Sequence, residues 1–143
     1  MNIGIVVQSQ TGHTLSVAER LREALTVAGH SVRLERVGTA DARSAIDASD
    51  ALVFATGVQG GQPAPPMASY MAQLPVLQGK QVACLATGFF PVAGWGRDQT
   101  LAKMQEVCEA RGATICGSGS VGWFSLSRRR QIGEVVETLS KLF

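Results

Sequence analysis

The stretch NIGIVVQSQTGHT, residues 2–14, opens with a short apolar run and ends with hydroxyl side chains gathered around a glycine. A continuous apolar run of this length is typical of a strand whose two faces are both covered. The residues after it predict an amphipathic helix that ends before Gly29. Its apolar stripe consists of Leu15, Ala18, Leu21, Leu25 and Ala28. Strand, loop and helix in this order form the repeating unit of a parallel α/β sheet.

The same alternation continues along the chain. Apolar strands are predicted at residues 50–57 and 81–88, an alternating edge strand at 31–37, and a short last strand at 113–116. Helices are predicted near residues 41–48, from Pro65, before Gly112 and from about Ser127. We therefore predict an α/β fold, a doubly wound five-stranded parallel sheet with helices on both faces, in a single domain spanning residues 1–143.

Composition limits the class of protein. Of the 143 residues, 45% are hydrophobic and 17% are charged, as in an ordinary globular domain. The net charge of +2, from 13 basic and 11 acidic side chains, is too small to predict nucleic-acid binding. The three cysteines show no CxxC or metal-ligand spacing, so we expect free thiols in a reducing compartment and no metal. Lacking a membrane-length apolar run and a signal peptide, the chain is expected to be cytoplasmic, with no membrane partner.

Three loops of unusual composition follow predicted strands. They comprise residues 9–14, 57–66 and 88–98, and they are rich in glycine, proline, hydroxyl and aromatic side chains. The carboxyl ends of parallel strands meet at one edge of a sheet, and ligands bind in the crevice outside that edge. The sequence therefore predicts one ligand site formed by all three loops.

The first of these loops, SQTGHT, combines three hydroxyl side chains with a glycine. It enters a helix, whose free N–H groups and dipole attract an anion, and Gly12 lets a ligand approach the backbone closely. The loop has no lysine, unlike the Gly-x-x-x-x-Gly-Lys-Ser/Thr loop of nucleoside triphosphatases. We therefore predict a site for one monoester phosphate, held by hydrogen bonds rather than by a cation. The alternative is an ordinary N-cap in which Thr11 or Thr14 satisfies the helix and nothing is bound.

These residues resemble those of the flavodoxin-like FMN-binding family. The phosphate loop of that family has the form Ser/Thr-x-Thr-Gly-x-Ser/Thr, which Ser9, Thr11, Gly12 and Thr14 match in place. The segment from residue 50 to residue 88 also resembles the middle of short flavodoxins, and the last strand lacks the long insertion of long-chain forms. The resemblance covers essentially the whole chain. It implies a short-chain form, the strand order 2-1-3-4-5, and FMN as the cofactor.

The resemblance also implies which residues surround FMN. The phosphate would be held by Ser9, Gln10, Thr11, Gly12, His13 and Thr14. The isoalloxazine ring would be held by a first ring loop containing Thr56, Gly57, Val58, Gln59, Gly60 and Gly61. It would also be held by a second ring loop containing Thr87, Gly88, Phe89, Phe90, Gly94, Trp95 and Gly96. Amides of the glycine pair 60–61 are candidates to bond flavin N5, and the three aromatic residues are candidates either to stack on the ring or simply to pack the loop.

The chain departs from the family pattern in two respects. Many members have Trp or Tyr in the first ring loop, where this chain has Gln59, so one ring face is expected to be open or to be covered only from the second ring loop. Flavodoxins in general are strongly acidic, which suits basic redox partners, whereas this chain has a net charge of +2.

The function that follows is an FMN-binding redox protein that passes electrons to and from a redox partner protein. One alternative is an NAD(P)H-dependent FMN quinone reductase, whose partners are NAD(P)H and a small acceptor. A second alternative is a cofactor-free binding or regulatory domain of the same fold. The three hydroxyls and the glycine of SQTGHT argue against this second alternative.

Other features allow two interpretations each. The run GSGSVG, residues 117–122, matches the dinucleotide fingerprint, but the chain ends after one more helix, so a bent or bulged final strand is expected instead. The three arginines at 128–130 predict a solvated helix face, with a docking patch or an NADPH phosphate contact as alternatives. His13 would approach the phosphate or face solvent. Arg97 would contact the flavin edge or a nicotinamide, or form a surface ion pair.

Overall fold

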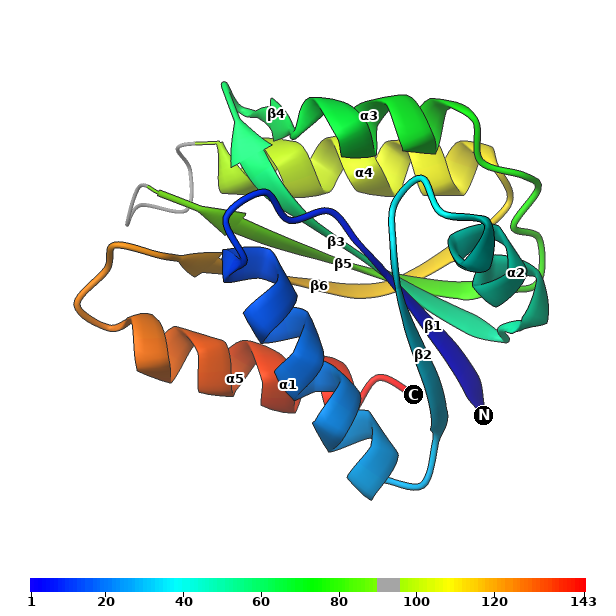
Figure 1. The fold of residues 1–143 in the computed structure, drawn as a ribbon, viewed down its shortest axis with the longest axis horizontal. Helices are drawn as coiled ribbons and strands as arrows, with labels where there is room; N and C mark the ends of the chain where they lie inside the picture. The colour runs from blue at the N-terminus through cyan, green and yellow to red at the C-terminus, as the bar shows by residue number, and fades with distance from the viewer. Residues whose placement is uncertain (90–95) are drawn as a thin grey trace.

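The computed structural model describes residues 1–89 and 96–143 of the chain. Within these residues, five parallel strands form one twisted sheet in the order β2-β1-β3-β5-β6 (Figure 1). The parallel strands are β1 (Asn2–Val7), β2 (Ser31–Arg36), β3 (Ala51–Gln59), β5 (Gln81–Gly88) and β6 (Thr114–Gly122). A short strand that was not predicted, β4 (Gln62–Pro63), pairs antiparallel with the end of β3. Counted over the parallel strands alone, the order is the predicted 2-1-3-4-5.

Helices cover both faces of the sheet, as the apolar strands predicted. One face carries α1 (His13–Val27) and α5 (Arg128–Ser140), and the other carries α2 (Ala40–Ala48), α3 (Pro65–Ala72) and α4 (Arg97–Ala110). Alternate residues of β3 point to opposite faces, so Leu52 and Phe54 join one buried cluster while Val53 and Ala55 join the other. None of the helices in residues 1–89 and 96–143 is long and apolar enough to span a membrane.

The helix boundaries follow local sequence signals. Helix α2 begins after Thr39, whose Oγ1 accepts a hydrogen bond from the N–H of Ala42 at 3.1 Å. Helix α3 begins at Pro65, as predicted, because proline suits the first helical position. The predicted stripe of α1 was wrong at one end, since the helix stops at Val27 and leaves Ala28 exposed beyond it. Val17, which the stripe did not include, is fully buried.

The last strand continues through the glycine-rich run at 117–122, where a bent or bulged final strand was predicted. Its pairing with β5 shifts register between Val82 and Ala83, opposite residues 115 and 117. This shift is the expected bulge, and it places the run in a strand rather than in a dinucleotide-binding turn. Pairing then continues without interruption to Gly122, so the strand carries no long insertion. That continuity agrees with the predicted short-chain form.

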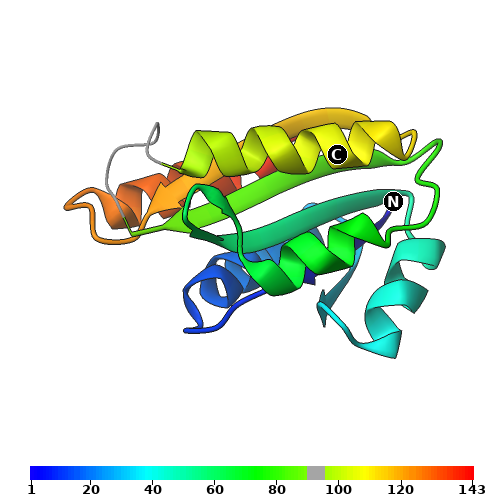
Figure 2. The same ribbon diagram turned by 90° about the horizontal axis from the view of Figure 1, so that it is seen from above.

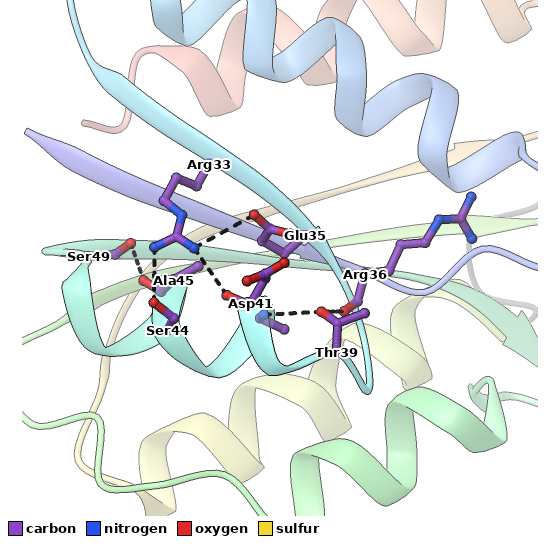
Figure 3. A network of polar contacts seen from close by, with 9 residues as sticks. Arg33, Glu35, Arg36, Thr39, Asp41, Ser44, Ala45 and Ser49 are labelled. Atoms are coloured by element: carbon purple, nitrogen blue, oxygen red, sulfur yellow. Dashed lines mark hydrogen bonds and ion pairs between the residues drawn. The ribbon is translucent and has the colours of Figure 1, made fainter.

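Strand β2 lies at one edge of the sheet, as its alternating sequence predicted. Figure 3 shows how its polar side chains are tied to the neighbouring helix α2. The Arg33 guanidinium donates to Ser44 Oγ at 3.3 Å and to the Asp41 carbonyl at 3.4 Å. The same guanidinium lies 3.7 Å from a carboxylate oxygen of Glu35. The charged side chains of Arg33 and Glu35 on this edge strand are therefore held in place on the side of α2.

The three cysteines are free, as predicted. Cys84 and Cys108 are buried, and Cys116 is half-buried. A hydrogen bond with Cys108, together with burial, raises the pKa of the Cys84 thiol well above its ordinary value. Burial also raises the pKa of Cys116. Since the thiolate is the reactive form, the raised pKa makes both thiols less reactive at neutral pH than an ordinary cysteine.

Candidate functional site

The first two predicted loops, and residues Gly88 and Phe89 at the start of the third, line one hollow at one end of the sheet. Figure 2 shows the connections that leave β1, β3 and β6 at the same end of the molecule, and Figure 1 agrees. Between them lies a hollow of about 500 Å³, part of which is open to solvent. Its walls are Gln8, Gln10, Thr11, His13, Thr14, Gly57, Val58, Gln59, Ala64, Thr87, Gly88, Phe89 and Trp123. Ten of these residues were predicted as site residues; Gln8, Ala64 and Trp123 were not.

The β1–α1 loop presents an uncapped helix N-terminus to this hollow. Gly12 precedes α1 with φ at +92°, a left-handed conformation that favours glycine. Its N–H donates to Ser9 Oγ at 3.0 Å, which holds the loop closed. No side chain caps α1, so the simple N-cap alternative for Thr11 or Thr14 is wrong. The first N–H groups of α1 are left to serve an anionic ligand.

Thr14 is held across the hollow rather than standing free in the loop. Its side chain is buried, and its Oγ1 lies 2.6 Å from Oγ1 of Thr87 at the end of β5. In such a pair one hydroxyl donates, and the accepting hydroxyl keeps its own hydrogen for another acceptor. Both residues line the hollow, so this remaining hydrogen is available to a ligand oxygen. The hydroxyl of Thr56 has two acceptors within reach of its single hydrogen, the Gly57 carbonyl at 2.9 Å and Gln8 Oε1 at 3.3 Å.

The first ring loop is a tight hairpin between β3 and β4. Gln59 pairs with Gln62, and the two central glycines, Gly60 and Gly61, have φ of +59° and +74°. Two central residues with positive φ define a type I′ turn, which glycine pairs favour. The turn rests on the start of α4, since a Cβ added to Gly61 would lie 2.8 Å from Gln99 Oε1. A Gly-Gly pair between two short strands was a hairpin signal that the sequence reading missed.

The side chain of Gln59 lines the hollow and contacts the loop at residues 9–14. Its Nε2 donates to Gln10 Oε1 at 3.4 Å, and both side chains line the hollow. Both residues are exposed, so the contact lies at the mouth. Because exposed amide side chains exchange partners with water easily, a ligand can displace this contact at low energetic cost.

An aromatic cluster that was not predicted lies at the hollow. Trp123, directly after β6, stacks on His13 with ring centroids 4.1 Å apart and planes 12° apart. The Arg128 guanidinium carbon lies 4.8 Å from the centre of the same indole. Phe89 meets His13 edge-on at 6.5 Å and stacks on Phe124 at 5.4 Å. The solvent-facing interpretation of His13 is therefore wrong, because the imidazole is half-buried in this cluster.

Other predicted residues lie away from the hollow. Arg97 is buried and donates to Ser120 Oγ on β6 at 3.2 Å, so its interpretation as a surface ion pair is wrong. Burial lowers the pKa of its guanidinium. Gly96 packs on the first ring loop, where its Cβ would lie 3.1 Å from Val58 Cγ1. Three predicted ring-loop residues, Phe90, Gly94 and Trp95, lie outside the described residues.

One cation stands beside the phosphate loop, although the sequence analysis expected none. Arg36, the last residue of β2, donates from Nη1 to the Ser9 carbonyl at 3.4 Å. Its side chain points away from the β2–α2 network in Figure 3. The parallel pairing of β1 with β2 carries Arg36 to the carboxyl edge, next to the loop that follows β1. The sequence signal for this cation was a basic residue at the end of a predicted edge strand.

The topology and the site together define a class of protein. An open parallel sheet, wound in both directions, with a ligand hollow at the carboxyl edge and an uncapped helix N-terminus inside it, is a doubly wound mononucleotide-binding fold. The model of the flavodoxin domain family matches residues 4–111 of the chain. The chain belongs to this family.

Comparison with solved structures shows the same fold over the whole length. The chain is similar to a flavodoxin of Streptococcus pneumoniae, at 20% identity and a TM-score of 0.76, with 99% of each chain covered. Flavodoxin 2 of Bacillus cereus, in its oxidised form, aligns at 18% identity and a TM-score of 0.78, with 100% of each covered. A Fusobacterium nucleatum flavodoxin bound to flavin mononucleotide aligns at 13% identity and 0.74, covering 99% of this chain and 98% of that one. No curated protein matches the chain.

Proposed function

We propose that this protein binds FMN in the hollow at the carboxyl edge and transfers electrons through it to a redox partner. The observation that carries the proposal is the uncapped N-terminus of α1 beside Gly12, at a hollow whose lining includes two glycines and the aromatic residues Phe89 and Trp123. Bound FMN supplies one-electron and two-electron redox chemistry. The residues of the chain bind it, orient it and limit its exposure to water.

The phosphate of FMN fits the loop at residues 9–14. Free N–H groups at the start of α1 and the left-handed Gly12 form a concave set of donors, which suits a phosphate. The Thr14–Thr87 pair offers one hydroxyl hydrogen from beneath. Arg36 adds a positive charge next to this loop, although its exposure and salt screening make this contribution small.

The flavin ring fits between the two ring loops. A Cβ on Gly57 would lie 3.8 Å from Thr14 Oγ1 and 3.9 Å from Gln8 Oε1, so the glycine leaves the floor of the hollow flat. Phe89 and Trp123 provide aromatic surface in the wall of the hollow. Glycine at both central positions of the 59–62 hairpin allows the peptide between them to present either its N–H or its carbonyl toward the hollow.

Titration of the purified protein with FMN, followed by flavin fluorescence, tests this function. Riboflavin, which lacks only the phosphate, is the matched control ligand. Tight binding of FMN with much weaker binding of riboflavin is the expected result. Addition of NADPH to the loaded protein then separates a carrier, which leaves the flavin oxidised, from an NADPH-dependent reductase, which bleaches it. Absence of FMN binding, in protein shown by circular dichroism to be folded, would reject the proposal.

A further inference from the structure

Beside the hollow, three large apolar side chains are exposed to solvent. Phe89 is 54% exposed, Phe124 67% and Leu126 fully exposed. We call these three residues the apolar rim. Phe89 also lines the hollow, and its ring stacks on that of Phe124, so the rim is continuous with the candidate site. Exposed apolar groups that cluster in this way mark interaction surfaces.

The rim lies next to a strongly basic segment. Arg128, Arg129 and Arg130 open helix α5 directly after it, and the last two are exposed. The nearest carboxylate on α5 is Glu134, one turn further along, 3.8 Å from the Arg130 guanidinium. The sequence of the connections at this edge, residues 8–14, 57–64, 88–98 and 122–131, contains one acidic residue, Asp98, against four arginines. The edge that holds the hollow is therefore positive, although the whole chain is close to neutral.

This charge distribution selects among possible occupants of the rim. A second copy of the chain, placed symmetrically, would bring the same positive edge of two chains together, which is repulsive. An anionic membrane would satisfy the arginines, yet it would cover the mouth of the hollow with lipid. A protein with acidic side chains around a small apolar contact satisfies both the rim and the arginines. It also brings its own redox centre close to the hollow.

We propose that the apolar rim and Arg129 and Arg130 form the docking surface for an acidic electron-transfer partner. The inference rests on the proposed function, because the surface borders the FMN hollow. In the complex, one electron leaves the reduced flavin and reduces the partner's oxidised centre, such as a ferric haem that becomes ferrous. Aromatic and arginine side chains are the residue types that contribute most at protein interfaces. The arginines accelerate the encounter by long-range attraction, and the rim supplies the short-range contact.

Two cytochromes of opposite charge probe this surface. The protein is loaded with FMN, reduced photochemically, and mixed in a stopped-flow instrument with either an acidic cytochrome b5 domain or the basic cytochrome c. Haem reduction is followed between about 10 mM and about 300 mM ionic strength, a range over which the screening length falls from tens of ångströms to a few. The rate constant for the acidic cytochrome is expected to fall as salt rises. That for the basic cytochrome is expected to rise.

Charge variants locate the effect on the molecule. The double variant R129Q/R130Q is expected to slow reduction of the acidic cytochrome about 3- to 10-fold at low salt and to flatten its salt dependence. The matched control R20Q/R22Q removes the same two charges from exposed positions on α1 and leaves that rate within about twofold. The variant L126S removes apolar contact from a fully exposed position and slows the reaction about threefold at every salt concentration.

Binding of the oxidised acidic cytochrome to the cofactor-free protein, measured by calorimetry at low salt, separates the two proposals. Binding that weakens in R129Q/R130Q but not in R20Q/R22Q supports the docking surface even if FMN does not bind. If FMN binds but the acidic cytochrome reacts with no salt dependence, or if both double variants behave alike, the docking surface is rejected while the proposed function stands. Preferential adsorption of the protein to phosphatidylserine vesicles, lost in R129Q/R130Q, would reassign the surface to a membrane and also reject the proposal.

Discussion

At the scale of single residues, the candidate site depends on a few short polar contacts. The buried pair Thr14 and Thr87 joins the phosphate loop to the end of β5 across 73 positions of sequence. The contact of Ser9 Oγ with the Gly12 N–H closes the same loop locally. Each contact fixes a backbone segment whose remaining donors face the hollow. Small changes at these positions therefore affect both stability and ligand affinity.

Removal of one hydroxyl of the buried pair is predicted to destabilise the fold. Thr87→Val leaves the Thr14 hydroxyl buried without its partner, at a cost of about 1–3 kcal/mol in the free energy of unfolding. Urea denaturation followed by circular dichroism measures this. Because T14V/T87V removes both hydroxyls, its loss is expected to be smaller than the sum of the two single losses. Additive losses would show that the two hydroxyls do not interact.

The Ser9 hydroxyl is predicted to matter for the phosphate and not for the ring. Ser9→Ala releases the Gly12 N–H from its acceptor and loosens the loop, which weakens FMN binding by about 0.5–1.5 kcal/mol, or ~2- to 10-fold. Riboflavin affinity is expected to stay unchanged, since riboflavin has no phosphate. Ser16→Ala, an exposed position on α1, is the matched control and leaves both affinities unaltered. Equal losses for both ligands in S9A would remove Ser9 from the phosphate site.

At the scale of elements, β6 packs closely against α5 and the residues that follow it. A Cβ added to Gly119 would lie 2.8 Å from Val135 Cγ1, and one added to Gly117 would lie 2.5 Å from Leu142 Cδ1. The glycines of GSGSVG thus let the helix lie directly on the strand. This contact also fixes the place where α5 begins, and with it the positions of Trp123 and the arginines that follow.

Two glycine-to-alanine changes in these elements are predicted to have opposite effects. Gly119→Ala forces α5 away from β6 and lowers the free energy of unfolding by about 1–3 kcal/mol. Gly133→Ala, inside α5 with open space around its Cβ, raises that free energy by about 0.5–1 kcal/mol because alanine favours the helix. Guanidinium denaturation of both variants measures the two changes. A stabilised G119A would show that the strand and the helix are not in close contact.

Sequence patterns predicted the elements in which the spacing of apolar residues marks the buried face. The apolar runs of β1, β3 and β5 predicted the parallel sheet, and the composition of SQTGHT predicted a loop at the ligand hollow. The run at 117–122 was expected as a bent or bulged strand from its glycines, although a glycine- and serine-rich run has little strand propensity and is held by pairing with β5. Trp123 was missed, since its position follows from where β6 ends. Contacts between distant segments, such as His13 with Trp123, arise only in the folded chain.

At the scale of the whole molecule, the hollow is bounded by connections that leave four strands. A ligand in it therefore contacts segments that are far apart in sequence but adjacent at one edge of the sheet. Binding to such a site is linked to global folding, because the unfolded chain has no comparable arrangement of donors. The ligand thus stabilises the native state as a whole rather than one loop.

FMN is accordingly predicted to raise the free energy of unfolding of the entire chain. At a free concentration 100 times its dissociation constant, the gain is about 2.7 kcal/mol. Thermal unfolding monitored by far-ultraviolet circular dichroism should shift upward as a single transition with increasing FMN. The same concentration of riboflavin should produce a much smaller shift. An unchanged midpoint at saturating FMN would contradict binding to the native fold.

The charged edge strand β2 has a consequence for the protein in concentrated solution. An uncovered strand edge is a template to which another chain can add, and such additions begin aggregation. Arg33 and Glu35 stand on that edge, and the contacts of Arg33 with α2 keep its charge in place. A second strand approaching this edge would have to strip water from those charges. The sheet therefore resists the addition of a strand at this side.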